Sequence, residues 1–331
     1  MKKLLTSGYS LIIFSSLALS FKGVLVKVGY NLGTDPMALM LMRLYVAVPC
    51  FIITLIAMEG KKAFTLRKDE IAIFAFMGIG GMGSAMVCSF KSLELIDASI
   101  NIVITYTYPA ITAIIMALFF GERIGIARMF SLVVTFFGLA LVVRADQAGM
   151  ETLKGAEGMG AILALASAFL YALYNIAGQN AMKRISPLRI SAYGTIFLTA
   201  FYGGILGVRP YPANLDAWGL AAILGIFCGV LPFLALMYGI KAIGASQTAI
   251  ISSFGPVFTS LLAYFLLGES LDNVQIGGMI MVITGIGALK LKLPVSLVSG
   301  STESIGEQLS SLGGSGGKGF AIVFKGRQKG G

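Results

Sequence analysis

Long apolar stretches alternate with short polar connections along almost the whole chain. Windows such as residues 71–90 and 98–120 hold no charged residue. Each is about as long as the twenty residues that cross a hydrocarbon core as a helix. The pattern predicts ten transmembrane helices, five in each half of the chain. Their expected ranges are 8–29, 37–58, 71–90, 98–120, 126–144, 159–182, 189–208, 217–239, 245–267 and 273–291.

The composition agrees with a chain that is solvated mainly by lipid. Hydrophobic residues make up 57% of the sequence and charged residues only 12%, whereas charged residues are about a quarter of a soluble domain. The chain has no histidine, so an imidazole base, a histidine-ligated zinc ion and a haem held by histidine are excluded. Cys50, Cys88 and Cys228 stand isolated in apolar stretches. We therefore expect no catalytic residues, no metal and no cofactor.

Basic residues indicate how the chain is oriented. The formal net charge is +10, but no aromatic and basic surface suited to stacking bases is recognisable, so nucleic acid is not expected as a partner. Lysine and arginine gather in the connections on the side of the N-terminus, and such residues favour the cytoplasm. Both termini are therefore predicted to be cytoplasmic.

The two halves of the chain resemble each other. Displacing the sequence by 147 positions aligns the third to fifth apolar stretches with the eighth to tenth, and a displacement of 151 aligns Ser16 with Ser167 and Pro36 with Pro187. Such self-similarity indicates a duplication. The pairs at the first displacement include Gly78 with Gly225, Ile96 with Ile243, Pro109 with Pro256, Thr112 with Thr259 and Gly138 with Gly285.

A repeat unit of five helices has a direct topological consequence. Because five is odd, the second unit enters the membrane from the opposite side, which is the symmetry of many secondary transporters. The predicted fold is an all-α membrane protein with ten transmembrane helices arranged as two inverted five-helix repeats. Residues 8–144 form the first repeat, residues 159–292 the second, and residues 293–331 a disordered, glycine- and serine-rich basic tail.

The first apolar stretch has a second interpretation. Met1, Lys2 and Lys3 followed by residues 11–19 also resemble a secretory signal with a cleavage point near Ala18. Cleavage would remove the counterpart of the sixth helix and break the repeat. We favour a retained first helix.

Paired motifs carry a resemblance to a known family. Tyr108-Pro109 through Gly121-Glu122 and Gly255-Pro256 through Gly268-Glu269 recur at identical spacing, each with an apolar stretch before the Gly-Glu pair. In these segments the chain resembles the EamA domain of the drug/metabolite transporter superfamily, in two tandem copies over residues 8–292. The resemblance implies a ten-helix transporter of small polar metabolites, often an exporter, in the plasma (inner) membrane of a prokaryote.

Polar side chains form a stripe on the fourth and the ninth predicted helix. Steps of three and four residues place them on one helical face, and polar groups are costly against lipid. We expect both stripes to face a substrate cavity, although hydroxyls bonded to their own helix or to a neighbour would give the same pattern. The positions are Asn101, Thr105, Tyr108 and Thr112, matched by Thr248, Ser252, Gly255 and Thr259.

Further candidates lie on the first, second and sixth predicted helices. Lys22 is expected to face the cavity and to bind a carboxylate or phosphate of the substrate, whereas Arg43 can do the same or extend to the membrane surface. Tyr171 and Asn175 share a face and offer an aromatic and an amide contact to a ligand, or else belong to the packed core.

Prolines and glutamates complete the set. Pro109 and Pro256 are expected to interrupt their helices, either as hinges or as fixed kinks. Glu122 and Glu269, at helix ends, are expected to cap a helix or to pair with Arg123 or Arg128. No acidic residue is predicted in mid-membrane, which argues against a simple carboxylate proton relay.

The function predicted from the sequence is a secondary transporter, an exporter, of a small polar solute such as an amino acid or its derivative, working by alternating access. Solute and membrane lipids are the expected partners, and the sequence leaves open whether the chain forms a homodimer. The alternative is a membrane-embedded sensor or assembly protein that keeps the fold without transport.

Overall fold

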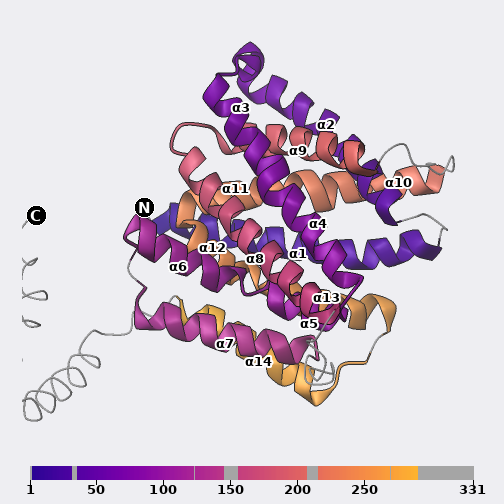
Figure 1. Ribbon diagram of the computed structural model, residues 1–331, viewed down its shortest axis with the longest axis vertical. Coiled ribbons are helices and arrows are strands. Elements are labelled where there is room, and N and C mark those ends of the chain that lie inside the picture. Colours follow the sequence, from indigo (N-terminus) through magenta and orange to yellow (C-terminus); the bar gives the residue numbers. More distant parts are fainter. Residues whose placement is uncertain are drawn as a thin grey trace, which may run out of the picture. The chain divides into compact units, whose positions relative to one another are not determined.

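The computed structural model describes residues 2–31, 36–122, 124–144, 156–206, 215–268 and 270–289. Every regular element in these ranges is a helix, which confirms the expected all-helical class (Figure 1). Arg123, Glu269 and the predicted tail 293–331 lie outside the described residues. The elements are α1 (Lys2–Asn31), α2 (Pro36–Glu59), η1 (Gly60–Phe64), α3 (Lys68–Ala75), η2 (Phe76–Gly83), α4 (Ser84–Leu93), α5 (Ala98–Thr105), α6 (Tyr108–Phe120), α7 (Ile126–Val142), α8 (Ala156–Ala181), α9 (Pro187–Leu206), α10 (Leu215–Gly225), η4 (Ile226–Val230), α11 (Leu231–Ile243), α12 (Ala245–Ser252), α13 (Phe254–Leu267) and α14 (Asn273–Ala288).

Many of these helices are long and apolar and expose apolar side chains on their outer surface. Within the described residues, six helical stretches are long and apolar enough to cross a membrane, and three shorter apolar helices accompany them. Large apolar side chains point outward, among them Leu118 and Phe119, which are 74% and 77% exposed. The chain is therefore an integral membrane protein. The six stretches are Ala38–Glu59, Lys68–Leu93, Ile100–Phe120, Ala156–Ala181, Leu215–Ile243 and Ala245–Leu266.

Two helical stretches are broken where the sequence places a proline. Pro109 has no N–H to donate to the carbonyl of Thr105, four residues earlier, and its ring crowds that turn. Helix α5 ends at Thr105, and α6 begins at Tyr108. The same break occurs in the second half of the chain, where α12 ends at Ser252, four residues before Pro256, and α13 begins at Phe254. The predicted interruption is thus present in both halves.

Two other stretches contain a wider, π-helical segment. η2 lies between α3 and α4, and η4 lies between α10 and α11. Both segments adjoin glycines that permit close contact with a neighbouring backbone. A Cβ atom added at Gly78 would lie 2.5 Å from the carbonyl oxygen of Gly194 in α9, and one added at Gly225 would lie 2.6 Å from that of Arg43 in α2.

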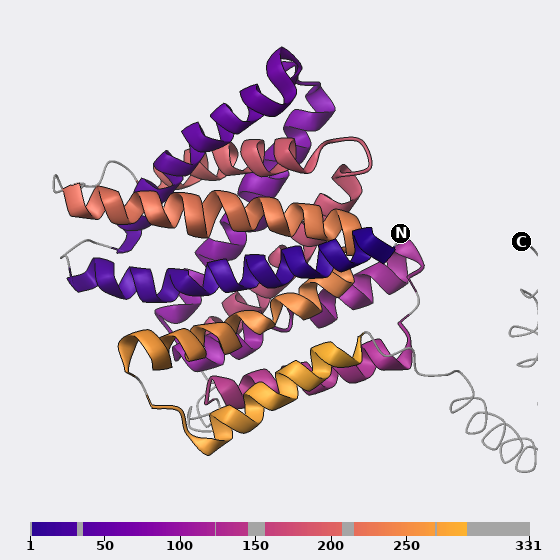
Figure 2. The same ribbon diagram turned by 180° about the vertical axis from the view of Figure 1, so that it is seen from behind.

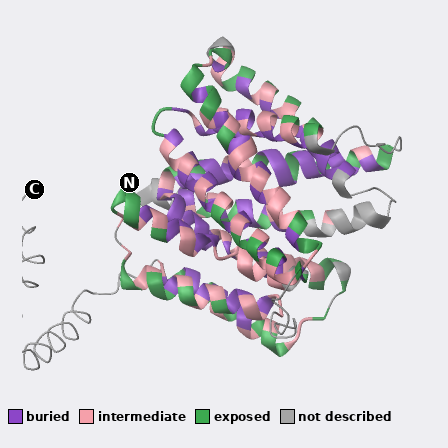
Figure 3. Ribbon diagram, in the orientation of Figure 1, coloured by how far each residue is buried: buried purple, intermediate pink, exposed green. Residues whose placement is uncertain are grey.

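Helix α1 is central to the bundle. It packs along α11 and α13, and Figures 1 and 2 show it among them from both sides. The Ser15 hydroxyl donates to the Pro232 carbonyl of α11 at 2.9 Å, and the Ser20 hydroxyl donates to the Gly255 carbonyl of α13 at 2.8 Å. Buried residues concentrate in this interior, whereas the outer helices carry exposed side chains (Figure 3).

Helices α7 and α14 form a tight pair at one edge of the bundle (Figures 1 and 2). A Cβ atom at Gly138 would lie 2.8 Å from the Gly278 carbonyl oxygen, and one at Gly285 would lie 2.5 Å from the Thr135 hydroxyl. Residue numbers therefore rise along one helix as they fall along the other, so the two helices are antiparallel. Glycine allows this approach because any side chain would separate the backbones.

Candidate functional site

A polar cavity of about 690 Å³ lies inside the helix bundle. Its walls come from helices in both halves of the sequence. The lining residues lie from the middle to the C-terminal end of α1, of α7 and of the whole stretch Lys68–Leu93. In α2, in α14 and in the whole stretch Ile100–Phe120 they lie in the N-terminal half. The cavity therefore extends from the middle of the bundle toward the end opposite the N-terminus of α1. Most of its surface is carbon, but it carries hydroxyl and basic groups from many helices, and we call this space the polar cavity.

Hydroxyl groups supply most of the polar lining. Ser16 and Ser167, which the repeat aligns, both face the polar cavity. Thr105 and Ser252, the last residues of the broken helices α5 and α12, face it as well. Hydroxyls can both donate and accept hydrogen bonds, so such a surface suits a polar solute. The other hydroxyl-bearing lining residues are Ser15, Ser20, Ser89, Tyr106, Tyr108, Tyr171, Thr259 and Ser260.

Three tyrosines form an aromatic wall on one side. The ring of Tyr108 lies edge-on to that of Tyr171 at 4.8 Å between centroids, and Tyr106 lies 5.8 Å from Tyr108. The Tyr108 hydroxyl is held by the Ala249 carbonyl of α12 at 3.1 Å. Edge-to-face contacts of this kind fix ring orientation. The wall is thus a preformed surface, built from α5, α6 and α8.

The structure brings together five of the eight substrate-contact residues expected from the sequence. The five residues that line the polar cavity are Lys22, Thr105, Tyr108, Tyr171 and Ser252. The hinge candidate Pro256 lines it too. The stripe on the fourth predicted helix therefore faces the cavity in part, and its matching stripe contributes Ser252 and Thr259.

The other three expected contact residues lie away from the cavity in this conformation. Asn101 is buried, and its side chain pairs with Ser89 at 3.3 Å. Asn175 is also buried and donates to the Tyr171 carbonyl of its own helix at 2.8 Å, which is the packing alternative raised for this residue. The buried Thr248 hydroxyl has no hydrogen-bond partner among the described residues. A period of three or four residues cannot tell a cavity wall from a helix contact beside it.

The charged lining residues are all cations. Lys22 of α1 is exposed to the cavity, Arg43 of α2 is buried at 7% exposure, and Arg144 pairs with Asp272 across α7 and α14. The described lining includes no aspartate or glutamate. The sequence left open whether Arg43 extends to the membrane surface; its burial excludes that position. It also gave no indication of the pairing between Arg144 and Asp272.

At the opposite end of the bundle, α1 begins, α11 ends and α12 begins, and these helices pack closely. We call it the sealed end. Here a Cβ atom at Gly8 would lie 2.8 Å from the Ala242 Cβ, and one at Gly239 would lie 2.1 Å from the Ile12 Cδ1. The Tyr9 hydroxyl donates to the Gln247 side chain at 3.0 Å. The α1 and α11 helices are therefore in close contact at this end, through small side chains.

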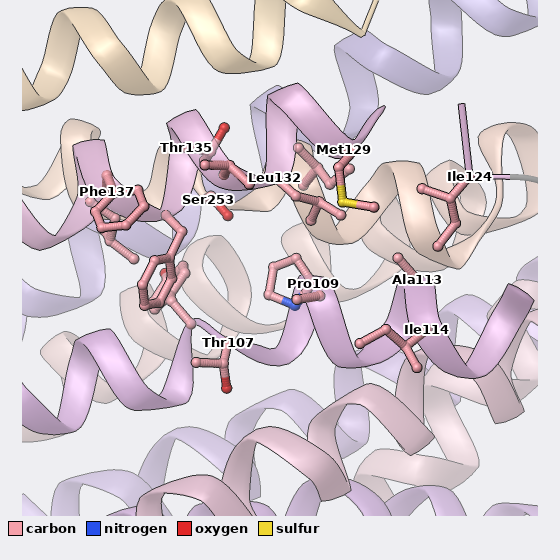
Figure 4. Close-up of a pocket in the computed structure, with 16 residues that line it drawn as sticks. Thr107, Pro109, Ala113, Ile114, Ile124, Met129, Leu132, Thr135, Phe137 and Ser253 are labelled. Atoms are coloured by element: carbon pink, nitrogen blue, oxygen red, sulfur yellow. The ribbon is translucent and has the colours of Figure 1, made fainter. Parts of the chain in front are cut away.

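A second, apolar crevice of about 370 Å³ lies beside α6 and α7. Figure 4 shows Pro109, Leu132 and Met129 along it, with carbon atoms making up nearly all of its lining. Pro109, the other hinge candidate, thus faces this crevice and not the polar cavity. A surface with so few polar atoms cannot satisfy a polar solute.

The remaining charged candidates serve the ends of helices. Glu122 pairs with Arg128 at 2.6 Å, as expected. Its counterpart Glu269 lies outside the described residues. The described residues hold no group of three or more histidine, cysteine, aspartate or glutamate side chains placed to bind a metal ion.

Comparison with known proteins agrees with this architecture. The model of the EamA-like transporter family matches residues 6–144 and again residues 158–290. The chain is 27% identical over 299 residues to the uncharacterized transporter YcbK of Bacillus subtilis (strain 168), covering 86% of this chain and 94% of that protein. It is 27% identical over 254 residues to the uncharacterized transporter YyaM of the same organism, covering 74% of this chain and 81% of that protein.

One crystal structure of a protein shares the fold, with a TM-score of 0.71 and 18% sequence identity over 88% of this chain and 97% of the other. Two matches of one family model, one on each half, account for both copies of the internal repeat. The chain belongs to the EamA-like transporter family.

Proposed function

We propose that the protein is a secondary transporter that moves a small polar solute, such as an amino acid or its derivative, by alternating access. One observation carries the proposal: a cavity of about 690 Å³, with hydroxyls from both halves of the sequence on its walls, reaches the middle of the bundle, while α1 and α11 are in close contact at the sealed end. A space that is open toward one side and closed toward the other is one of the two states that alternating access requires.

The proposal includes ten transmembrane helices in two inverted repeats, residues 8–144 and 159–292. Support comes from glycine contacts that repeat between the halves. Gly78 approaches Gly194 as Gly225 approaches Arg43, and the displacements of 147 and 151 relate these two pairs to each other. The antiparallel course of α7 and α14 is the arrangement that a two-fold axis in the membrane plane produces.

The direction of the cavity supports a specific state of the cycle. With both termini in the cytoplasm of a prokaryotic cell, as the basic residues predict, the polar cavity opens to the outside and the sealed end faces the cytoplasm. This is the state from which an exporter releases its solute. Lys22, Thr105, Tyr108, Tyr171 and Ser252 are the proposed solute contacts, and the broken helices before Pro109 and Pro256 are the proposed hinges.

A reversible cross-link at the sealed end tests the proposal. With the three native cysteines replaced, Gly8→Cys and Ala242→Cys would bring their Cβ atoms to 2.8 Å in the present backbone. A disulfide needs about 3.5–4.5 Å between these atoms, so α1 and α11 must move apart by about 1 Å for the bond to form. A first thermal-shift screen of amino acids, sugar phosphates and nucleotide sugars selects the solute.

Flux of that radiolabelled solute is then measured in proteoliposomes. We expect flux to stop on oxidation and to return on reduction, because the sealed end must open in each cycle. Each single-cysteine variant should be insensitive to the oxidant. A protein that binds the solute but gives no more flux than empty liposomes would overturn transport and favour a sensor.

A further inference from the structure

The polar cavity carries charge that the protein does not balance. Three cations line it, and no aspartate or glutamate occurs in its described lining. The Arg144 guanidinium is paired with Asp272. Neither the Lys22 ammonium nor the Arg43 guanidinium has a hydrogen bond or an ion pair within the described part of the chain. Two positive charges therefore face the cavity without an opposite charge.

Arg43 is the more unusual of the two. Its side chain is only 7% exposed, and a buried charge that is neither paired nor hydrogen-bonded destabilises a folded protein. Arginine in the second turn of a membrane helix can usually extend to the surface, but this burial shows that Arg43 does not. The nearby Tyr202 hydroxyl, close enough to interact with the charge of Arg43, is also buried without a hydrogen-bond partner among the described residues.

Lys22 completes the arrangement from the neighbouring helix. Its side chain is exposed and lines the same cavity as Arg43. Two cations on the wall of one cavity repel each other, and a bound anion would offset that repulsion. The cation pair is confined to the first half, since the displacement of 151 aligns Lys22 with Leu173 and Arg43 with Gly194.

We propose that Lys22 and Arg43 form an anion subsite, so that the transported solute is an organic anion whose carboxylate or phosphate group lies between them. This inference rests on the proposed transport function. A guanidinium binds carboxylate and phosphate oxygens in a two-pronged, charge-assisted geometry, and the ammonium adds a mobile donor. The remainder of the solute faces the hydroxyls and the tyrosine wall on the other side of the cavity. The solute therefore has one orientation, with its charged end toward α1 and α2.

Binding to the purified protein in detergent tests the subsite. The probes are glycerol 3-phosphate, succinate and inorganic phosphate, with glycerol as the neutral comparison and sodium chloride at equal ionic strength as the salt control. We expect at least one organic anion to raise the melting temperature and glycerol to have no effect. The phosphate and carboxylate arms show which oxyanion the subsite prefers.

Variants assign the effect to the two residues. Arg43→Gln and Lys22→Gln should each weaken the apparent affinity at least tenfold, because either change removes a charge-assisted contact. The matched control is Lys91→Gln, which removes a positive charge from an exposed ion pair with Glu94 outside the cavity and should leave affinity unchanged. Arg43→Gln should also leave the melting temperature of the ligand-free protein the same or higher, since it removes an unbalanced buried charge.

The outcomes separate this inference from transport itself. Equal stabilisation by glycerol and by the anions, or affinities of both variants within twofold of the wild type, would overturn the subsite. If Arg43→Gln fails to fold, Lys22→Gln decides alone, since its exposed side chain is not needed for packing. Flux of a neutral solute that is unaffected by Lys22→Gln would overturn the subsite but leave transport standing, whereas absence of any flux would overturn transport.

Discussion

The two ends of the helix bundle differ although the same helices run through both. At the sealed end, α1 and α11 touch through glycine, and Ile12 lies directly over Gly239. Farther from the sealed end, α1 and α11 still meet, since the Ser15 hydroxyl donates to the Pro232 carbonyl. Both helices also line the polar cavity there, α1 with Ser16 and α11 with Leu236. Closure depends on small residues that let backbones meet. In the proposed cycle, the hydroxyls that line the polar cavity would be satisfied by water or by solute.

This difference assigns a separate role to each set of residues. In the proposed transport cycle, the small residues at the sealed end would determine which state is stable, and the polar residues around the cavity would determine what is bound. A larger side chain should therefore have opposite consequences at the two ends: loss of stability at one, and loss of transport without loss of stability at the other. The three following changes test that contrast.

Gly239→Val should have the largest effect on stability. A Cβ atom there would lie 2.1 Å from the Ile12 Cδ1, so α1 and α11 must separate. Overpacking of this kind costs about 1–3 kcal/mol, which would appear as a clear fall in melting temperature in detergent.

Two comparisons make the Gly239 experiment specific. Gly219→Val, at a glycine with nothing within 4 Å of its Cβ position, controls for the helix propensity of valine. Ile12→Ala combined with Gly239→Val should be less destabilising than the sum of the single changes, because the clash is then removed. Strict additivity would show that the two side chains do not meet.

Met86→Trp should act on transport and hardly on stability. Met86 lines the polar cavity and is only partly buried, so a larger ring can occupy empty space where solute would bind. We expect a melting temperature close to that of the wild type and at least a tenfold fall in flux, about 1.4 kcal/mol. Normal flux with tryptophan in place would mean that the cavity is not the route.

Tyr9→Phe should have the smallest effect. It removes the hydrogen bond from Tyr9 to Gln247 across the sealed end, which is worth about 0.5–1.5 kcal/mol. The balance between the two states should shift by roughly two- to tenfold toward opening of the sealed end.

An impermeant maleimide can measure that shift. It is added to the side that we propose to be cytoplasmic and labels a cysteine introduced by Gln179→Cys in α8, next to the sealed end. Gln179 lies against the start of α12, where its side chain accepts a hydrogen bond from the Ala245 backbone. The cysteine lacks that bond, so Tyr9→Phe is compared with Tyr9 in the same Gln179→Cys background, and labelling should rise when α12 moves away. Tyr264→Phe, at an exposed tyrosine of α13, is the matched control. An equal change in labelling with either variant would show that the Tyr9 contact does not hold the seal.

The sequence was informative where local chemistry determines structure. The apolar stretches located the helices because lipid requires about twenty apolar residues to cross. The prolines located the breaks because a missing N–H acts on the carbonyl four residues before it, at Thr105 and at Ser252. The displacement that aligned Ser16 with Ser167 also identified two residues of the cavity wall.

Tertiary packing determined the rest, and no local pattern reports it. Asn175 and Tyr171 share a helical face, yet Asn175 is bonded to its own helix while Tyr171 reaches the cavity. The burial of Arg43 depends on how α2 lies against α9 and η4. The sequence alone could not show that Arg43 is buried without an opposite charge, because a charged side chain near a helix end usually extends to water.

The π-helical segments η2 and η4 have a consequence for how a wall of the cavity can turn. Each π turn accommodates one residue more than an α turn. If such a segment tightened to α-helical geometry, everything beyond it would rotate by about 100° around the helix axis, while the flanking helices kept their own hydrogen bonds. Met86 and Ser89 follow η2, and Pro232 and Phe233 follow η4. A change confined to the π-helical segment would therefore exchange the side chains that α4 or α11 presents to the cavity for side chains that now face away. The helical part before the segment, α3 or α10, would stay in place.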